Sequence, residues 1–170
     1  MNTPFPKSRL LMNTLAASVA LVLTSATVWA GSTATQTVTY EVTAINEISV
    51  SGSPAALTVN TATAGSAPTD ATDASTTWAV TTNQNGAKIT AAIDTAMPTD
   101  TTLKVNLAAP TGATSLGAVT LGTTAVDAVT GISQLNESSK TVTYTLSALP
   151  TAGVIASASK TVTFTITGGV

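Results

Sequence analysis

Residues 35–50 read TQTVTYEVTAINEISV, and the predicted fold depends on this stretch. Its apolar residues fall on every second position from Val38 to Ala44, and the alternation returns at Ile48 and Val50. Successive side chains of a β-strand point to opposite faces, so these residues line one face and the threonines between them line the other. The pattern predicts a single β-strand over most of the stretch.

The core of this pattern returns twice near the C-terminus. Residues 139–146 read SKTVTYTL and residues 159–166 read SKTVTFTI, and both share the order T-V-T-aromatic-x-aliphatic with residues 37–42. A solenoid needs more repeats at an even spacing than these three copies provide. The copies therefore indicate similar strands within one β-sandwich.

Further short alternating runs are separated by turn residues along the chain. Strands are expected at residues 75–82, 89–93, 103–107, 140–147 and 160–167, and weaker ones at 57–59, 119–121 and 154–158. The spacing of three among Val126, Val129 and Ile132 is compatible with a helical turn, but we expect a bent or bulged edge strand there. Asn85-Gly86 predicts a hairpin turn, residues 61–74 an exposed loop, and residues 137–139 a turn. The expected fold is all-β, an immunoglobulin-like β-sandwich of about eight strands. The predicted core residues are Trp78, Val80, Ile89, Leu103, Val105, Val142, Tyr144, Leu146, Val162, Phe164 and Ile166.

The first thirty residues have the layout of a secretory signal peptide. Lys7 and Arg9 precede an apolar run at residues 15–23, and small residues stand before Gly31 at the −3 and −1 positions. The run is too short to span a bilayer. We expect a signal peptide at residues 1–30, an N-terminal strand segment at 31–50 and a sandwich domain at 51–170.

Composition narrows the classes of function. Without residues 1–30 the chain has four lysines and no arginine against eight acidic residues, so its net charge falls from −2 to −4. Such a chain has no basic patch for nucleic acid or for an acidic membrane surface. Only 8% of the whole chain is charged and threonine is its commonest residue after residue 30, which suits a surface that packs against other copies of itself.

The chain offers little material for an active site. It contains no cysteine and no histidine, which removes the usual catalytic triads and most metal sites. Ser157 and Lys160 match the S-x-x-K pattern without its companion motifs, and Asp70 and Asp73 lack the further ligands of a Ca²⁺ loop. We expect no catalytic residues, no metal, no cofactor and no enzymatic activity.

The order of these features resembles the major pilins of colonisation-factor-type chaperone–usher pili. These proteins have a signal peptide and an alternating N-terminal strand that ends in a motif similar to VTAINEI at residues 42–48. They lack cysteine, and a P-T-A-G loop like residues 150–153 precedes a last alternating strand like residues 160–167. The resemblance covers the layout of most of the exported chain.

The resemblance implies a structural subunit of an extracellular filament, a pilus or biofilm fibre, at the cell surface. In that family each sandwich lacks one strand and the N-terminal strand of a neighbouring subunit fills the gap. The implied partners are copies of this chain, a periplasmic chaperone and an outer-membrane assembly protein, with no nucleic acid and no direct membrane span. The implied donor-strand residues are Val38, Tyr40, Val42, Ala44 and Ile48.

Two alternatives remain open from the sequence. Residues 35–50 can instead be the first strand of their own sandwich. The protein can also be a secreted binding module for carbohydrate or a host surface, which would require an exposed aromatic platform such as Trp78.

Overall fold

A computed structural model describes residues 32–169, which include nine strands and one short 3₁₀ turn. The predicted signal peptide lies outside the described residues. The elements are β1 (Asn46–Val50), β2 (Ala71–Thr82), β3 (Ala87–Ile93), β4 (Thr101–Leu107), β5 (Thr114–Ser115), β6 (Val119–Thr120), β7 (Val126–Ile132), β8 (Leu135–Ala148), η1 (Pro150–Ala152) and β9 (Val162–Thr167).

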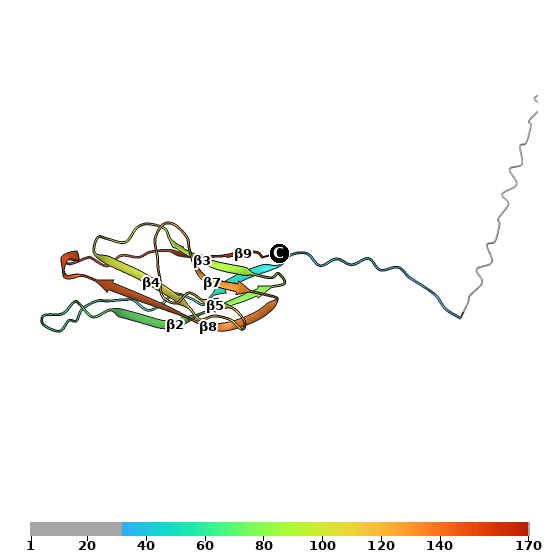
Figure 1. Cartoon of the computed structure of the whole chain (residues 1–170), viewed down its shortest axis with the longest axis horizontal. Helices are drawn as coiled ribbons and strands as arrows, with labels where there is room; N and C mark the ends of the chain where they lie inside the picture. Colours follow the sequence, from blue (N-terminus) through green and yellow to red (C-terminus); the bar gives the residue numbers. More distant parts are fainter. Residues whose placement is uncertain (1–31, 170) are drawn as a thin grey trace, which may run out of the picture. The chain divides into compact units, whose positions relative to one another are not determined.

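The strands form two antiparallel sheets that pack face to face. The first sheet has the order β1-β2-β8-β4-β6 and the second has the order β5-β7-β3-β9. Figure 1 shows β3 and β9 along the upper side of this sandwich, and β2 and β8 along the lower side. The predicted β-sandwich is therefore confirmed.

The chain divides into two units, Met1–Tyr40 and Glu41–Val170, and the first of them is described only from residue 32. All nine strands belong to the second unit. Within the first unit, residues 32–40 contain no helix or strand and are exposed. Glu41–Val170 thus carries the whole sandwich.

The core forms where the alternating faces of the two sheets meet. In β3 and β4 every second side chain is buried, as period-two patterning requires. Seven of the predicted core residues are buried, with Trp78 at 1% and Ile89 at 0% exposed. They are Trp78, Val80, Ile89, Leu103, Val105, Val142 and Tyr144. Leu146, Val162, Phe164 and Ile166 are only partly buried.

One lateral side of the sandwich is closed by the chain itself. β5 pairs in one sheet and β6 pairs in the other, so residues 114–120 cross from sheet to sheet. Directly after them, the Leu121 N–H donates to the Leu103 carbonyl at 2.9 Å, and the Ile93 N–H donates to the Gly122 carbonyl at 2.9 Å. Leu121 is 4% exposed and belongs to the core, so this crossing contributes a buried side chain to the closed side.

Several local predictions were wrong. The strand predicted across residues 35–50 is limited to β1, and β1 belongs to the five-stranded sheet rather than to a separate N-terminal segment. The loop predicted at 61–74 ends earlier, because β2 begins at Ala71. No strand forms at 57–59 or at 154–158, since neither run finds a partner strand within the described chain.

The turn expected at residues 137–139 was also misplaced. These residues lie inside β8, and the reversal comes earlier, at Gln134, whose φ is 43°. Ser139 has a φ of 58°, so the turn-like composition of this region accommodates an irregularity within a long strand. β7 is bulged as predicted, with register shifts against β3, but β5 covers its outer edge.

Candidate strand-binding site

The other lateral side of the sandwich is bordered by two edge strands, each of which has one edge without a partner strand. Within the described chain, β1 pairs only with β2 and β9 pairs only with β3. The two strands meet at one end, where a Cβ added to Gly168 would lie 2.7 Å from the Asn46 Nδ2 atom. No hydrogen-bonded ladder joins them along the rest of their length.

Both strands direct unpaired backbone groups toward this open side. The Thr161 carbonyl accepts a hydrogen bond at 3.1 Å from the N–H of Asp94, which directly follows β3, so odd-numbered residues of β9 face β3. In an antiparallel ladder the alternate residues face the opposite edge. The N–H and C=O groups of Val162, Phe164 and Ile166 therefore face the open side.

The same alternation applies to β1. The Ile45 carbonyl accepts from Asn83 N–H at 3.3 Å, and the Ser51 N–H donates to the Thr77 carbonyl at 2.8 Å. The odd-numbered residues thus face β2, and the backbone of Ile48 faces outward. The open side is bounded by two rows of backbone donors and acceptors, which form a template for an added strand.

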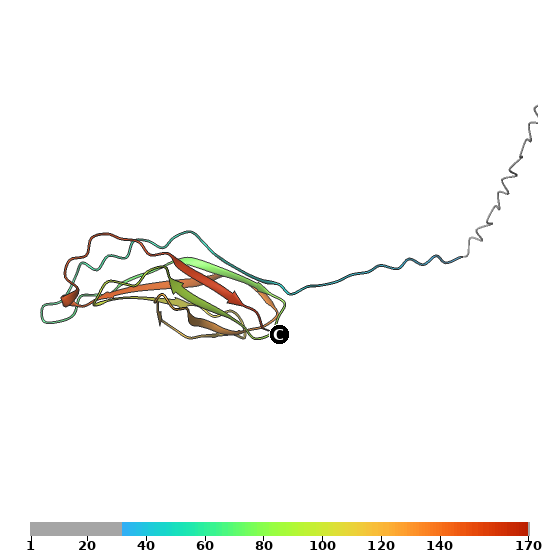
Figure 2. The ribbon, with the colours of Figure 1, turned by 90° about the horizontal axis from the view of Figure 1, so that it is seen from above.

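Two extended runs continue these edges away from the point where they meet. Residues 52–60 follow β1, and residues 154–160 precede β9. Neither run makes a backbone–backbone hydrogen bond in the described chain, and both appear in Figure 2 as thin coil without strand arrows. Extended backbone without partners is what remains when one strand of a ladder is missing.

The side chains along the open side are apolar and incompletely covered. Val162, Phe164 and Ile166 pack against the core but stay partly exposed, as do Ile48 and Leu57 on the opposite edge. Val154 is fully exposed at 103% and Ile155 is 44% exposed, in the run that leads into β9. These apolar residues and the two unpaired edges define the strand-binding groove.

The predicted donor-strand residues are mostly exposed. Val38, Tyr40 and Val42 are 74%, 88% and 78% exposed, and Ala44 is exposed as well. Ile48 is the exception and corrects the prediction, because it lies in β1 opposite Val80 and packs against the core of its own sandwich. The alternation alone does not mark where the free segment ends and β1 begins.

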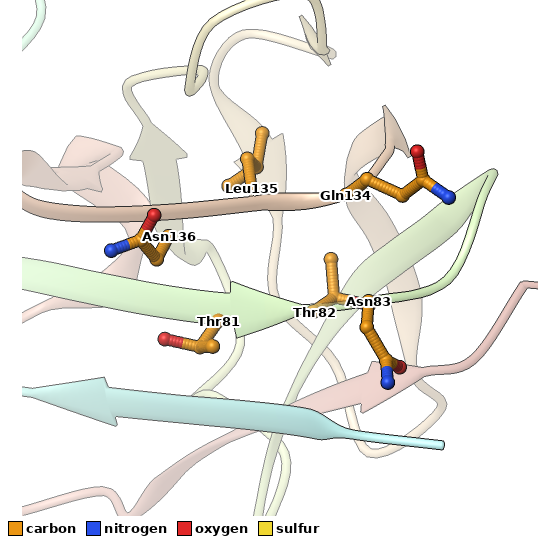
Figure 3. Close-up of a pocket in the computed structure, with 6 residues that line it drawn as sticks. All are labelled: Thr81, Thr82, Asn83, Gln134, Leu135 and Asn136. Carbon is orange, nitrogen blue, oxygen red and sulfur yellow. The ribbon is translucent and has the colours of Figure 1, made fainter. Parts of the chain in front are cut away.

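A hollow between the end of β2 and the start of β8 is lined by hydroxyl, amide and aliphatic side chains. It has a volume of about 480 Å³, and Figure 3 shows the side chains around it at the end of β2 and the start of β8. They are Thr81, Thr82, Asn83, Gln134, Leu135 and Asn136. Hydroxyl and amide groups do not titrate near neutral pH, so this lining offers no acid or base.

Two ion pairs lie at the surface of the described residues. Lys88 contacts Asp127 at 2.9 Å, and Lys140 contacts Glu137 at 2.5 Å. Lys140 and the hydrogen bonds from Thr111 lower the pKa of Glu137 from 4.5 to about 2. These pairs lie on strand surfaces and bring no group of three potential metal ligands together among residues 32–169.

The sequence patterns considered for chemistry have structural partners. Lys160 of the S-x-x-K pattern donates to the Thr95 hydroxyl at 2.7 Å and to the Ala96 carbonyl at 2.9 Å. Asp73 accepts from the Ser75 N–H and hydroxyl. Across residues 32–169, no helix is long and apolar enough to cross a bilayer.

Comparison with protein-family models, with curated proteins and with solved structures found no match.

Proposed function

We propose that this protein is a structural subunit of an extracellular filament, a pilus or biofilm fibre, that polymerises by strand donation. Residues 35–44 of one copy occupy the groove between β1 and β9 of the next copy. The observation that carries the proposal is the pairing of two complementary features in one chain. One is a sandwich with a single open, apolar side, and the other is an exposed alternating segment.

The dimensions of the segment and the groove agree. The unpaired run at residues 52–60 is nine residues long and the segment at 35–44 is ten, and ten extended residues span roughly 33 Å. Burying the side chains of Val38, Tyr40 and Val42 contributes on the order of 5 kcal/mol, before the cost of ordering the segment is subtracted. Backbone hydrogen bonds to the two open edges add affinity.

The direction of the added strand follows from which groove end is blocked. The end near Asn46 and Gly168 is narrow, and it is also where the receiving copy's own N-terminal segment leaves β1. The body of the donating copy therefore sits beyond the opposite end, on the side of residues 52–60 and 154–160. The donated strand then runs antiparallel to β9, and successive copies extend in one line.

The binding-module alternative required an exposed aromatic platform such as Trp78. Trp78 is 1% exposed and Tyr144 is 7% exposed, so neither can stack on a sugar ring. The aromatic side chain that is largely exposed, Tyr40, lies within the proposed donor segment at 88% exposure.

The test compares two forms of the chain. One begins at Gly31, and the other is the compact unit Glu41–Val170, which keeps β1 and removes Val38 and Tyr40. Size-exclusion chromatography and negative-stain electron microscopy should show polymers for the first form and monomers for the second. A synthetic peptide of residues 35–45 should bind the shorter form and not the longer one.

Controls separate strand donation from general stickiness. A peptide with Tyr40→Asp and Val42→Asp places two charges on the face that enters the groove, and it should bind at least 100-fold more weakly. A peptide with Thr39→Asp and Glu41→Gln changes the opposite face and should bind nearly as well as the original. Monomers from the chain beginning at Gly31, together with no peptide binding by the shorter form, would refute the proposal.

A further inference from the structure

One side chain fixes the path of the chain just before β1. Asn83 follows the last residue of β2, and its Nδ2 donates to the Thr43 carbonyl at 2.7 Å. Its Oδ1 accepts from the Ile45 N–H at 2.8 Å, and its own backbone N–H donates to the Ile45 carbonyl at 3.3 Å. A primary amide offers the donor and the acceptor of a peptide bond. Asn83 therefore prolongs the β1–β2 ladder by one step beyond the strand.

A second set of hydrogen bonds holds the start of β1 against the same end of β2. The Thr82 hydroxyl donates to Asn46 Oδ1 at 2.7 Å, and Asn46 Nδ2 donates to Gln84 Oε1 at 3.1 Å. Thr82 is only 4% exposed, so this contact is shielded from competing water. The chain from Thr43 into β1 is thereby held extended, in line with the strand.

This geometry prevents the chain from filling its own groove with the full apolar face. The groove runs along the free edge of β1, so self-insertion requires the chain to reverse immediately before that strand. A reversal takes at least two residues out of the extended conformation, and residues 43–45 cannot supply them while Asn83 holds them straight. A turn placed earlier keeps Val42 and Ala44 outside the groove and leaves only Val38 and Tyr40 available.

We infer that Asn83 is a positioning residue that commits the apolar segment to a second copy of the chain and prevents it from closing its own sandwich. This inference rests on the proposed function. Without the Asn83 amide, residues 43–45 are free to turn. Intramolecular insertion then competes with donation at a rate that does not depend on protein concentration.

The experiment uses the chain beginning at Gly31 with Asn83→Ala, and Asn85→Ala in the same turn as the matched control. Asn83→Asp is a graded variant, because its carboxylate still accepts from Ile45 N–H and cannot donate to the Thr43 carbonyl. The fraction of closed monomer is measured at several concentrations by size-exclusion chromatography. Closed monomer is defined as monomer that no longer binds the peptide of residues 35–45. Hydrogen exchange at the Ile45 amide is followed in parallel.

The expected result has two parts. Asn83→Ala raises the exchange rate of the Ile45 amide about tenfold, as the loss of one hydrogen bond predicts, and it raises the closed-monomer fraction at least threefold. Asn85→Ala changes neither quantity, and Asn83→Asp raises the monomer fraction while changing Ile45 exchange less. An unchanged exchange rate in Asn83→Ala, or polymers that form as completely as in the unmodified chain, overturns the inference.

Failure of the proposed function has a different signature. In that case the unmodified chain does not polymerise, and the unit Glu41–Val170 does not bind the peptide. The inference about a second copy is then wrong as well. Hydrogen exchange at Ile45 reports on the Asn83 contacts alone. It therefore separates an incorrect contact from a correct contact in a protein that does not donate its strand.

Discussion

The openness of the β1–β9 side can be measured with two isoleucines that face each other across one strand pair. Ile89 of β3 pairs directly with Ile166 of β9. Ile89 is 0% exposed, whereas Ile166 is partly exposed. Replacing each with alanine removes the same atoms from neighbouring positions, so the difference between the two variants reports on enclosure.

The two substitutions should differ by about 2 kcal/mol in the free energy of unfolding. Ile89→Ala leaves an enclosed cavity and should cost about 3–4 kcal/mol. Ile166→Ala removes less buried surface and opens to solvent, so the cavity contribution is absent and the cost should be about 1–2 kcal/mol. Urea unfolding of Glu41–Val170, followed by the fluorescence of buried Trp78, measures both values.

Peptide binding provides the second half of the test. With the peptide of residues 35–45 bound, Ile166 becomes enclosed, and the cost of Ile166→Ala should rise toward that of Ile89→Ala. The peptide should accordingly bind Ile166→Ala about tenfold more weakly than the unmodified unit. Equal costs for the two substitutions in the free unit would show that the β9 face is already enclosed, and the reasoning from the open side would be wrong.

Three further predictions concern single residues outside the groove. Gly153 has φ 65° and ψ −159°, a region that only glycine adopts readily, so Gly153→Ala should lower the free energy of unfolding in a urea titration by about 1–3 kcal/mol. Gly122 is the control, because it has no positive φ and a Cβ added there meets no atom within 4 Å. Gly122→Ala should therefore be nearly neutral. The pKa of Glu137 is lowered to about 2, so its stabilising effect is present above its ordinary pKa of 4.5 and is lost as pH falls toward 2. Stability measured from pH 7 to 2 should therefore fall less in Glu137→Gln, and identical profiles would contradict this. Burial raises the pKa of the Tyr144 hydroxyl above 10.0. The unfolded chain therefore loses the hydroxyl proton at lower pH than the folded chain does, and the free energy of unfolding falls as pH rises through 10. Tyr144→Phe should reduce this fall, which urea unfolding at pH 9 to 11 measures.

The sequence by itself determined the fold class and most of the core. Alternation at Trp78 and Val80, and again at Val142 and Tyr144, requires strands with one buried face, because every second side chain points the same way. The Asn85-Gly86 turn between β2 and β3 was located for a similarly local reason, but the predicted hairpin was wrong, because β2 and β3 lie in different sheets and do not pair. Such features depend on neighbours in sequence, so they can be predicted without the tertiary structure.

The same logic could not place the strand boundaries that depend on distant partners. Residues 71–74 have the composition of a loop but join β2, because β8 lies beside them. Residues 154–158 alternate well enough for a strand yet remain unpaired. In both cases the presence or absence of a hydrogen-bonding partner strand decides the conformation. A local sequence pattern does not reveal a partner strand that is far along the chain.

The candidate site shows the same division most clearly. The sequence identified an apolar alternating segment, but the alternation resumes at Ile48 after a single break at Asn46, so Ile48 was assigned to the wrong side of the boundary. Only the tertiary structure shows that Asn83 and β2 hold the chain from Thr43 onward. The structure also shows that β5 and β6 close one side of the sandwich while β1 and β9 leave the other open. An unpaired edge is a property of strand order, and strand order is set by packing between residues that are remote in sequence.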